Sequence, residues 1–230
     1  MLEKIILAEP RGFCAGVEVA IDTVKRVAEA FPGEPIYMLH EIVHNKYVVN
    51  ELKEKYGIIF VEKISEIPNS ARVIFSAHGS SPEVYDEAKI KNIKVVDATC
   101  DLVSKVHRKA RRYADLGYEI VLIGHEGHQE VIGTMGQVKE IHLVQTPLDV
   151  EKLPIPIKSK VASITQTTLS FYDVDTTMKA LKKRFVNLIN PQDDICYATT
   201  NRQEAVMSMA DKVDLILVVG EKNSSNSQRL

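Results

Sequence analysis

The stretch VVDATCDLVSKVH, residues 95–107, passes from an apolar run typical of a β-strand into a helical periodicity, with Cys100 at the junction. The same arrangement recurs twice. RGFCAGVEVAIDTV places Cys14, and DDICYATTNRQEAV places Cys196, directly before a helical pattern. The three cysteines divide the chain into thirds of similar architecture. This pattern predicts three α/β units, each with a cysteine where a strand or turn meets a helix.

Short apolar runs alternate with helical patterns along the whole chain. The expected strands lie at 4–8, 35–39, 72–77, 94–98, 118–124, 141–144, 161–165 and 214–220. The expected helices lie at about 15–30, 45–56, 82–91, 101–116, 171–185 and 201–211, and Ser170 with Asp173 resembles a capping box. Strands that alternate with helices favour an α/β fold with mostly parallel sheets, covered on both faces.

The cysteines also suggest the unit boundaries. We expect a first unit at 14–99, a second at 100–195, and a third made of 196–230 with an N-terminal strand within 1–13. No Pro/Gly/Ser-rich linker separates them, so we expect them to pack around a shared centre. The tail KNSSNSQRL directly follows the last expected strand. The third unit is therefore expected to be incomplete in this sequence.

The composition limits the partners. Lys and Arg total 29 and Asp and Glu total 31, a net charge of −2, which argues against a nucleic-acid or membrane-surface partner. The apolar run near the N-terminus is too short for a signal peptide or a membrane span. We therefore expect a cytoplasmic protein.

Three cysteines are an odd number, which does not favour a disulfide framework. A helix N-terminus favours thiolate, and parallel sheets gather their sites where strands end. If the units surround an axis, Cys14, Cys100 and Cys196 converge, and three thiolates suit an iron–sulfur cluster or a zinc site. A four-iron cluster on three cysteines would leave one iron without a protein ligand. The alternative is that they are small buried apolar residues.

Two histidines follow expected strands and precede turns that open helices. His78 stands before Gly-Ser-Ser-Pro, and His128 stands before Gln-Glu. Imidazoles beside free helical N–H groups suit phosphate oxygens, although either could be an ordinary loop residue. His107 is expected on the surface of a basic helix, and His142 is expected to be structural within a strand.

Other residues suggest further chemistry. HEIVH at 40–44 matches the H-E-x-x-H zinc pattern, but that motif needs a helix and here it follows an expected strand. Glu130 could act as a general acid if its pocket is dry, or it could be a surface carboxylate. Thr167 and Thr168 end an expected strand, where their hydroxyls could bond a substrate oxygen or cap a helix.

Eight blocks in order then carry a resemblance: PRGFCAGV, HEIVHNKYVV, IFSAHGSS, VVDATCDLVSKVH, IGHEGHQEVIGTMGQ, TQTTLS, DDICYATTNRQEA and VVGEKNSSNSQRL. Together they resemble the 4-hydroxy-3-methylbut-2-enyl diphosphate reductase (IspH/LytB) family over essentially the whole chain. The resemblance implies reduction of this diphosphate to isopentenyl and dimethylallyl diphosphate, the last step of the non-mevalonate isoprenoid route. It also implies a trefoil of three α/β units around a central [4Fe-4S] cluster.

The resemblance assigns residues as well. It implies Cys14, Cys100 and Cys196 as cluster ligands, and Glu130 as the proton donor with Thr167 near the substrate hydroxyl. The implied diphosphate contacts are His44, His78, His128, Ser224, Ser225 and Asn226. The implied electron donor is a ferredoxin or flavodoxin. The family's chain continues past the Ser/Asn motif, whereas this sequence ends at Leu230, so we expect a pocket open on that side and doubtful activity.

Two other classes of function remain open from the residues alone. One is a zinc hydrolase built on HEIVH or on the three thiols. The other is a non-catalytic fragment that binds neither cluster nor substrate.

Overall fold

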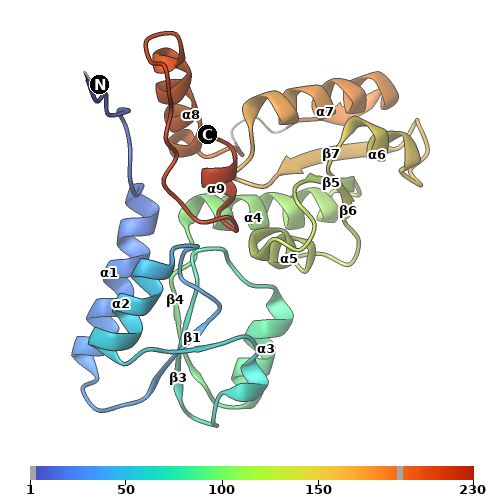
Figure 1. The fold of residues 1–230 in the computed structure, drawn as a ribbon. Coiled ribbons are helices and arrows are strands. Elements are labelled where there is room, and N and C mark those ends of the chain that lie inside the picture. Colours follow the sequence, from blue (N-terminus) through green and yellow to red (C-terminus); the bar gives the residue numbers. More distant parts are fainter. Residues whose placement is uncertain (1–3, 191–193) are drawn as a thin grey trace.

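The computed structural model describes residues 4–190 and 194–230. In that part of the chain, two four-stranded parallel sheets carry helices on both faces (Figure 1). The first sheet has the order β2-β1-β3-β4 and the second has the order β6-β5-β7-β8. In each sheet, the first strand in the sequence lies between the second and the third. The two sheets therefore have the same strand order.

The first sheet is short in every strand. Its strands are β1 (Ile36–Leu39), β2 (Ile59–Val61), β3 (Arg72–Phe75) and β4 (Lys94–Asp97). Its helices are α1 (Ala15–Ala30), α2 (Lys46–Tyr56) and α3 (Pro82–Ile90), with the 3-10 helix η1 (Ile64–Glu66) between β2 and β3.

Alternation along these strands explains the two layers. Met38 and Ile74 pack with the apolar residues of α1 and α2, whereas Leu39 and Phe75 pack with Ala88 of α3. Because successive side chains of a strand point to opposite faces, a continuous apolar run supplies both layers at once.

The second sheet repeats the plan. Its strands are β5 (Glu119–Ile123), β6 (His142–Val144), β7 (Lys160–Thr165) and β8 (Asn187–Ile189). The helices around it are α4 (Asp101–Asp115), α5 (Gln129–Met135), α6 (Pro147–Lys152) and α7 (Phe171–Arg184).

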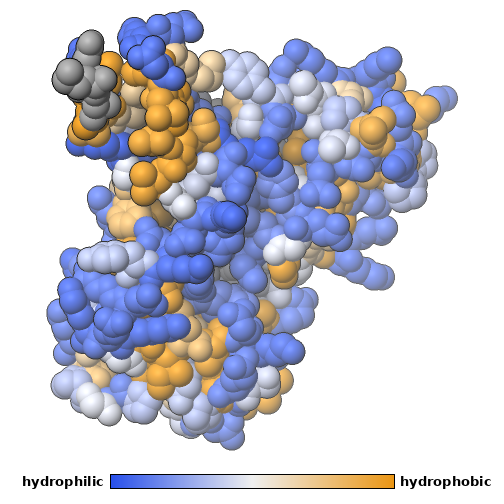
Figure 2. Space-filling model, viewed as in Figure 1, coloured by the Kyte–Doolittle hydropathy of each residue, from blue (hydrophilic) through white to orange (hydrophobic). Residues whose placement is uncertain are grey.

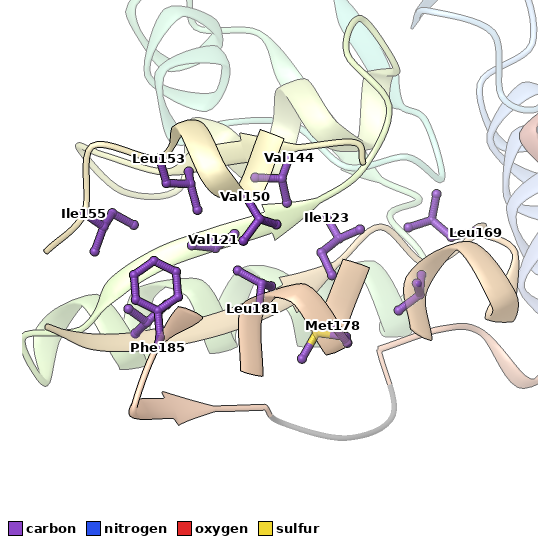
Figure 3. Close-up of a cluster of buried hydrophobic side chains, with 12 residues drawn as sticks. Val121, Ile123, Val144, Val150, Leu153, Ile155, Leu169, Met178, Leu181 and Phe185 are labelled. Carbon is purple, nitrogen blue, oxygen red and sulfur yellow. The ribbon is translucent and has the colours of Figure 1, made fainter. Parts of the chain in front are cut away.

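The second core has the same two layers. Val121 and Ile123 pack with α6, with Leu181 of α7 and with Phe185 directly after α7, and the last two are almost fully buried (Figure 3). Ile120 and Leu122 point to the other face and pack with Val106 of α4. Sequence periodicity thus predicted six strands close to their observed positions. It missed the two short edge strands β2 and β8, and the short helices α5 and α6.

The two sheets are joined through close backbone contact. A Cβ atom placed on Gly133 of α5 would lie 2.8 Å from the carbonyl oxygen of Gly79, in the turn after β3. The Gln137 side chain donates to the Ser80 carbonyl oxygen at 3.0 Å. Glycine therefore lets α5 of the second unit rest on the first unit's turn.

The expected strands at 4–8 and 214–220 were wrong. Within the described residues, no strand pairing includes either segment. Leu217 and Val219 are 78% and 96% exposed, and apolar surface follows this part of the chain in Figure 2. A strand needs a neighbour to pair its backbone groups, and apolar composition alone does not supply one.

The remaining helices lie near the C-terminus. They are α8 (Tyr197–Ala210), which begins earlier than predicted, and α9 (Ser225–Gln228). The expected boundaries of the three units stay a prediction. Residues 1–3 of the expected third unit and residues 191–193 of the expected second unit lie outside the described chain. None of the described helices has the length and apolar character needed to cross a membrane.

Candidate functional site

The three cysteines stand immediately before three helices. Cys14 precedes α1, Cys100 precedes α4 and Cys196 precedes α8, and each occupies the N-cap position. These helices approach one another in the middle of the molecule (Figure 1). The predicted placement of each thiol at a helix start is therefore confirmed.

The thiols also meet in space. A Cβ atom on Gly16 would lie 3.1 Å from Sγ of Cys100 and 3.9 Å from Sγ of Cys14. Cys196 and Cys14 are both close enough to act on the ionisation of Cys100. The backbone N–H of Cys196 donates to the Thr167 carbonyl oxygen at 2.8 Å, which attaches this thiol to the end of β7. Three segments far apart in the sequence thus share one centre.

The ionisation of Cys100 depends on opposing effects. Burial raises its pKa, the backbone N–H groups of Leu102 and Val103 lower it, and the neighbouring thiols raise it again. The N–H groups of the helix start thus lower the pKa of Cys100 as expected, but burial outweighs them.

The donor set suits an iron–sulfur cluster. Sulfur donors are the ligands that such clusters use, and Gly16 leaves open the space beside two of them. Within the described residues, no group of three or more His, Cys, Asp or Glu side chains is placed to hold a single metal ion.

Three histidines from three loops form one cluster. His44 lies between β1 and α2, His78 follows β3, and His128 is the N-cap of α5. The ring of His44 stacks on His78 with centroids 4.6 Å apart, and His128 lies edge-on to both, with centroids 5.6 and 5.7 Å away. All three follow the carboxyl ends of parallel strands, where ligand sites gather.

Burial controls the charge of this cluster. It lowers the pKa of His78 well below its usual value, and the nearby His44 and His128 lower it further. Burial, with His44 second, lowers the pKa of His128 to about 4. His44 has polar neighbours, since Glu41 lies 3.5 Å from its Nδ1 and the Asn223 amide lies 3.4 Å away. At neutral pH the free cluster therefore contains at least two uncharged imidazoles.

Glu130 is a buried acid with two hydrogen-bond donors. Its carboxylate accepts from the backbone N–H of Thr167 at 2.6 Å and from the Thr167 hydroxyl at 3.0 Å, and the residue is 2% exposed. Burial raises the pKa to about 7, although both bonds from Thr167 oppose the shift. A carboxyl group that exchanges its proton near neutral pH is suited to general acid chemistry.

The Ser/Asn turn reaches the end of β7. The Ser225 hydroxyl donates to the Thr168 carbonyl oxygen, and Asn226 accepts from the Thr199 hydroxyl at 2.9 Å. The Ser224 hydroxyl accepts from the backbone N–H of Ser227 and caps α9. A cavity of about 420 Å³ lies beside this turn. It is lined by His125, Glu126, Gly127, His128, Asn223, Ser225, Gln228 and Arg229.

Sequence reasoning missed Gln166, which connects several of these groups. It is 1% exposed, its side-chain oxygen accepts from the His125 backbone N–H at 3.0 Å, and its amide donates to the Thr168 hydroxyl at 3.0 Å. The signal available was a polar residue directly after the expected strand at 161–165. Its partners are distant in sequence, so the pattern alone could not identify them.

The prediction that His107 is exposed was wrong. It is 6% exposed, its Nε2 has no hydrogen-bond partner within the described chain, and burial followed by Arg111 lowers its pKa to about 4. His107 belongs to the buried face of α4 with Val103 and Val106. It packs against Gly79, where an added Cβ would lie 2.8 Å from its ring.

The zinc motif reading of HEIVH fails on geometry. His40 has a positive φ of 60° and α2 begins only at Lys46, so residues 40–44 are not helical. His40 instead contacts the Glu62 carboxylate at 2.9 Å, while His44 points to the imidazole cluster. The expectation that the context weakens this match is confirmed. His142 opens the edge strand β6, as expected of a structural residue.

Comparisons with known proteins agree with the motifs. A family model described as LytB protein matches residues 5–230. A 4-hydroxy-3-methylbut-2-enyl diphosphate reductase of Azoarcus sp. (strain BH72) is 54% identical over 99% of this chain and 73% of its own length. The reductase of the same name from Escherichia coli O1:K1 / APEC is 53% identical, with the same two shares.

Solved structures agree in fold. The E-1-hydroxy-2-methyl-but-2-enyl-4-diphosphate reductase of Plasmodium falciparum superposes with a TM-score of 0.92 at 44% identity, over 96% of this chain and 70% of that one. A structure of (E)-4-hydroxy-3-methyl-but-2-enyl diphosphate reductase, titled the terminal enzyme of the non-mevalonate pathway, gives 0.75 at 33% identity. It covers 98% of this chain and 79% of that one.

Proposed function

The chain belongs to the LytB protein family, and from that membership we propose that it reduces 4-hydroxy-3-methylbut-2-enyl diphosphate to isopentenyl and dimethylallyl diphosphate. The reaction removes the hydroxyl group as water and takes up two electrons and two protons. It is the last step of the non-mevalonate isoprenoid pathway. The observation that supports it most is the cluster of three imidazoles beside a buried acid and three converging thiols.

The imidazole cluster holds the diphosphate. His44, His78 and His128 offer ring N–H groups to phosphate oxygens, and any ring that takes up a proton when the anion binds offsets the anionic charge. The turn of Ser224, Ser225 and Asn226 adds hydroxyl and amide groups from a different segment. Holding the anion at one end orients the carbon chain and lowers the entropic cost of reaction.

Glu130 supplies the proton. In its protonated form it lies beside Thr167, whose hydroxyl is 3.0 Å from the carboxyl group and passes the proton toward the substrate hydroxyl. Because the surroundings are dry, the acid keeps its proton to near pH 7 and can release it to a leaving group.

Cys14, Cys100 and Cys196 hold a [4Fe-4S] cluster, which when bound supplies the electrons and a Lewis-acidic iron without a protein ligand. Because Gly16 has no side chain, the space beside the sulfurs of Cys100 and Cys14 stays open. A ferredoxin or flavodoxin delivers the electrons, and the reaction takes place in the cytoplasm.

Anaerobic purification followed by metal analysis and turnover tests this proposal. We expect about four irons with matching sulfide per chain, and oxidation of a reduced dye only when the hydroxymethylbutenyl diphosphate is added. Cys100→Ser is the control, since it removes one sulfur ligand and should lose iron. About one zinc per chain would favour the hydrolase class instead. No iron and no turnover after cluster reconstitution would favour the non-catalytic fragment.

A further inference from the structure

Arg229 joins the C-terminal turn to two other segments of the pocket. Its Nη1 donates to the Asp173 carboxylate at 3.0 Å, at the start of α7, and its Nη2 contacts Nε2 of His125. Asp173 resembled part of a capping box in the sequence. In the structure its backbone N–H donates to the Ser170 hydroxyl, while its carboxylate pairs with Arg229.

His125 leads directly to a predicted diphosphate contact. The backbone N–H of His128 donates to the His125 carbonyl oxygen at 3.2 Å, which closes the turn between them. Burial, followed by the positive charge of Arg229, lowers the pKa of His125, so its imidazole is uncharged and can accept a hydrogen bond from the guanidinium. The position of the His125 ring therefore bears on where His128 lies.

Gln166 completes a closed set of contacts. It accepts from the His125 backbone N–H at 3.0 Å and its amide reaches the Ser225 hydroxyl at 3.5 Å. Ser225 belongs to α9 and Arg229 directly follows that helix. Because Arg229 contacts His125, this series of contacts closes on the residue where it began. The His125 turn and the Ser/Asn turn are thus held together at both ends.

Arg229 also lines the cavity beside His128 and Ser225. It is the only Lys or Arg among the eight residues that form that cavity. Both terminal nitrogens contact protein partners, Asp173 and His125, whereas the buried Nε has no hydrogen-bond partner in the described chain. These contacts indicate that Arg229 affects the pocket by fixing the positions of the residues that it contacts.

We propose that Arg229 is a positioning residue of the diphosphate pocket, which fixes the His125 turn, and with it His128, against the turn that carries Ser225. This inference rests on the proposed function, because it assumes that the diphosphate binds between these turns. An arginine suits the task, since its planar fork can hold two partners in fixed directions.

Arg229→Met tests the role in the reconstituted protein. We expect the KM for the hydroxymethylbutenyl diphosphate and the Kd for inorganic diphosphate to rise by about tenfold, with a smaller change in kcat. The cluster absorbance should not change. Arg229→Lys should recover only part of the affinity, since it keeps the charge without the fork. Lys179→Met is the matched control, since it removes a cation paired with Asp175 on the same helix α7.

A double-mutant cycle separates positioning from general loss of stability. If Arg229 acts partly through His128, adding Arg229→Met to His128→Ala should weaken diphosphate binding by less than Arg229→Met does alone. Fully additive losses, or an unchanged KM and Kd in Arg229→Met, would overturn the inference. If Arg229→Met does not fold, Asp173→Ala decides, since it removes the acceptor that anchors the guanidinium, and an unchanged KM there overturns the inference too.

The same measurements distinguish the two levels of proposal. If the unmodified protein neither turns over nor binds inorganic diphosphate, the proposed function fails. If it does both, and Arg229→Met behaves like Lys179→Met, only the role of Arg229 fails.

Discussion

The two four-stranded sheets and the segment 196–230 are built from similar sequence patterns but reach different structures. The sheets bury their apolar strands between helices, whereas residues 214–220 remain extended with Leu217 and Val219 in solvent. Both regions contribute to the candidate site. The sheets carry the histidines, Glu130 and Thr167 at their strand ends, and the last segment brings Cys196 and the Ser/Asn turn.

The difference shows that an apolar run becomes a strand only where partners are present. β1 and β5 each lie between two neighbouring strands, and their backbone groups are paired on both sides. Residues 214–220 have the same composition but no paired neighbour in the described chain. We therefore expect the sheets to hold their site residues in fixed positions, and the residues of the last segment to make contacts that adjust more easily.

The largest expected effect comes from the buried acid on the second sheet unit. Glu130→Gln should lower kcat by at least about a hundredfold, since the amide keeps the shape but cannot donate a carboxylic proton. The iron content and the cluster absorbance should stay at the level of the unmodified protein. Steady-state kinetics with a reduced dye measure the effect.

The matched variant from the last segment is Ser225→Ala, for which we expect a loss within about tenfold. If Glu130→Gln retains full turnover, the acid assignment is wrong. If Ser225→Ala is the more damaging change, the division between the two regions is wrong.

The next largest effect is on the free energy of unfolding, which should respond strongly to a substitution in the second core and weakly to one in the last segment. Leu181→Ala leaves a cavity in the α7 layer of the second core and should cost about 2–5 kcal/mol. Leu217→Ala removes a side chain that is 78% exposed and should change stability by less than about 0.5 kcal/mol. Urea unfolding followed by circular dichroism measures both. A large loss for Leu217→Ala would mean that residues 214–220 are packed in solution.

His128→Ala should weaken diphosphate binding by about tenfold without loss of iron, because it removes one member of the imidazole cluster. Ser224→Ala is the comparison, since that hydroxyl caps α9 and should affect binding less. Calorimetric titration with inorganic diphosphate measures both affinities. A large fall in iron content in His128→Ala would instead indicate a structural role or a cluster ligand.

The most gradual expected effect is the pH dependence of binding. The pKa values of His78 and His128 are lowered, so the free pocket binds few protons at neutral pH, while a bound anion favours the charged rings. Binding should then take up protons, and affinity should fall as pH rises, by up to about tenfold per pH unit for each proton.

Calorimetry with isopentenyl diphosphate in buffers of different ionisation enthalpy counts these protons. The measurement belongs above about pH 7, where the terminal phosphate has already lost its proton. Affinity that is constant with pH, together with no proton uptake, would show that the rings stay neutral. The His78→Asn variant is the control, since it should take up fewer protons.

Much of the site could be predicted because its residues stand at fixed places in repeated local patterns. Cys100, His78 and His128 each follow a strand and precede a helix, and parallel strands present these positions at one edge. Glu130 was recognisable as a candidate acid, but its pKa near 7 depends on burial and on Thr167, which is distant in sequence. Gln166 and Arg229 were missed for the same reason.

The sequence by itself determined the alternation of strands and helices, the parallel sheets and the location of the thiols at helix starts. Those features depend on side-chain periodicity and on neighbours within a few residues. Tertiary structure alone decided that His107 is buried, that residues 214–220 form no strand, and that three imidazoles meet within 6 Å of one another. Burial, strand pairing and ring contact all require a second segment of chain, and local pattern does not specify which segment arrives.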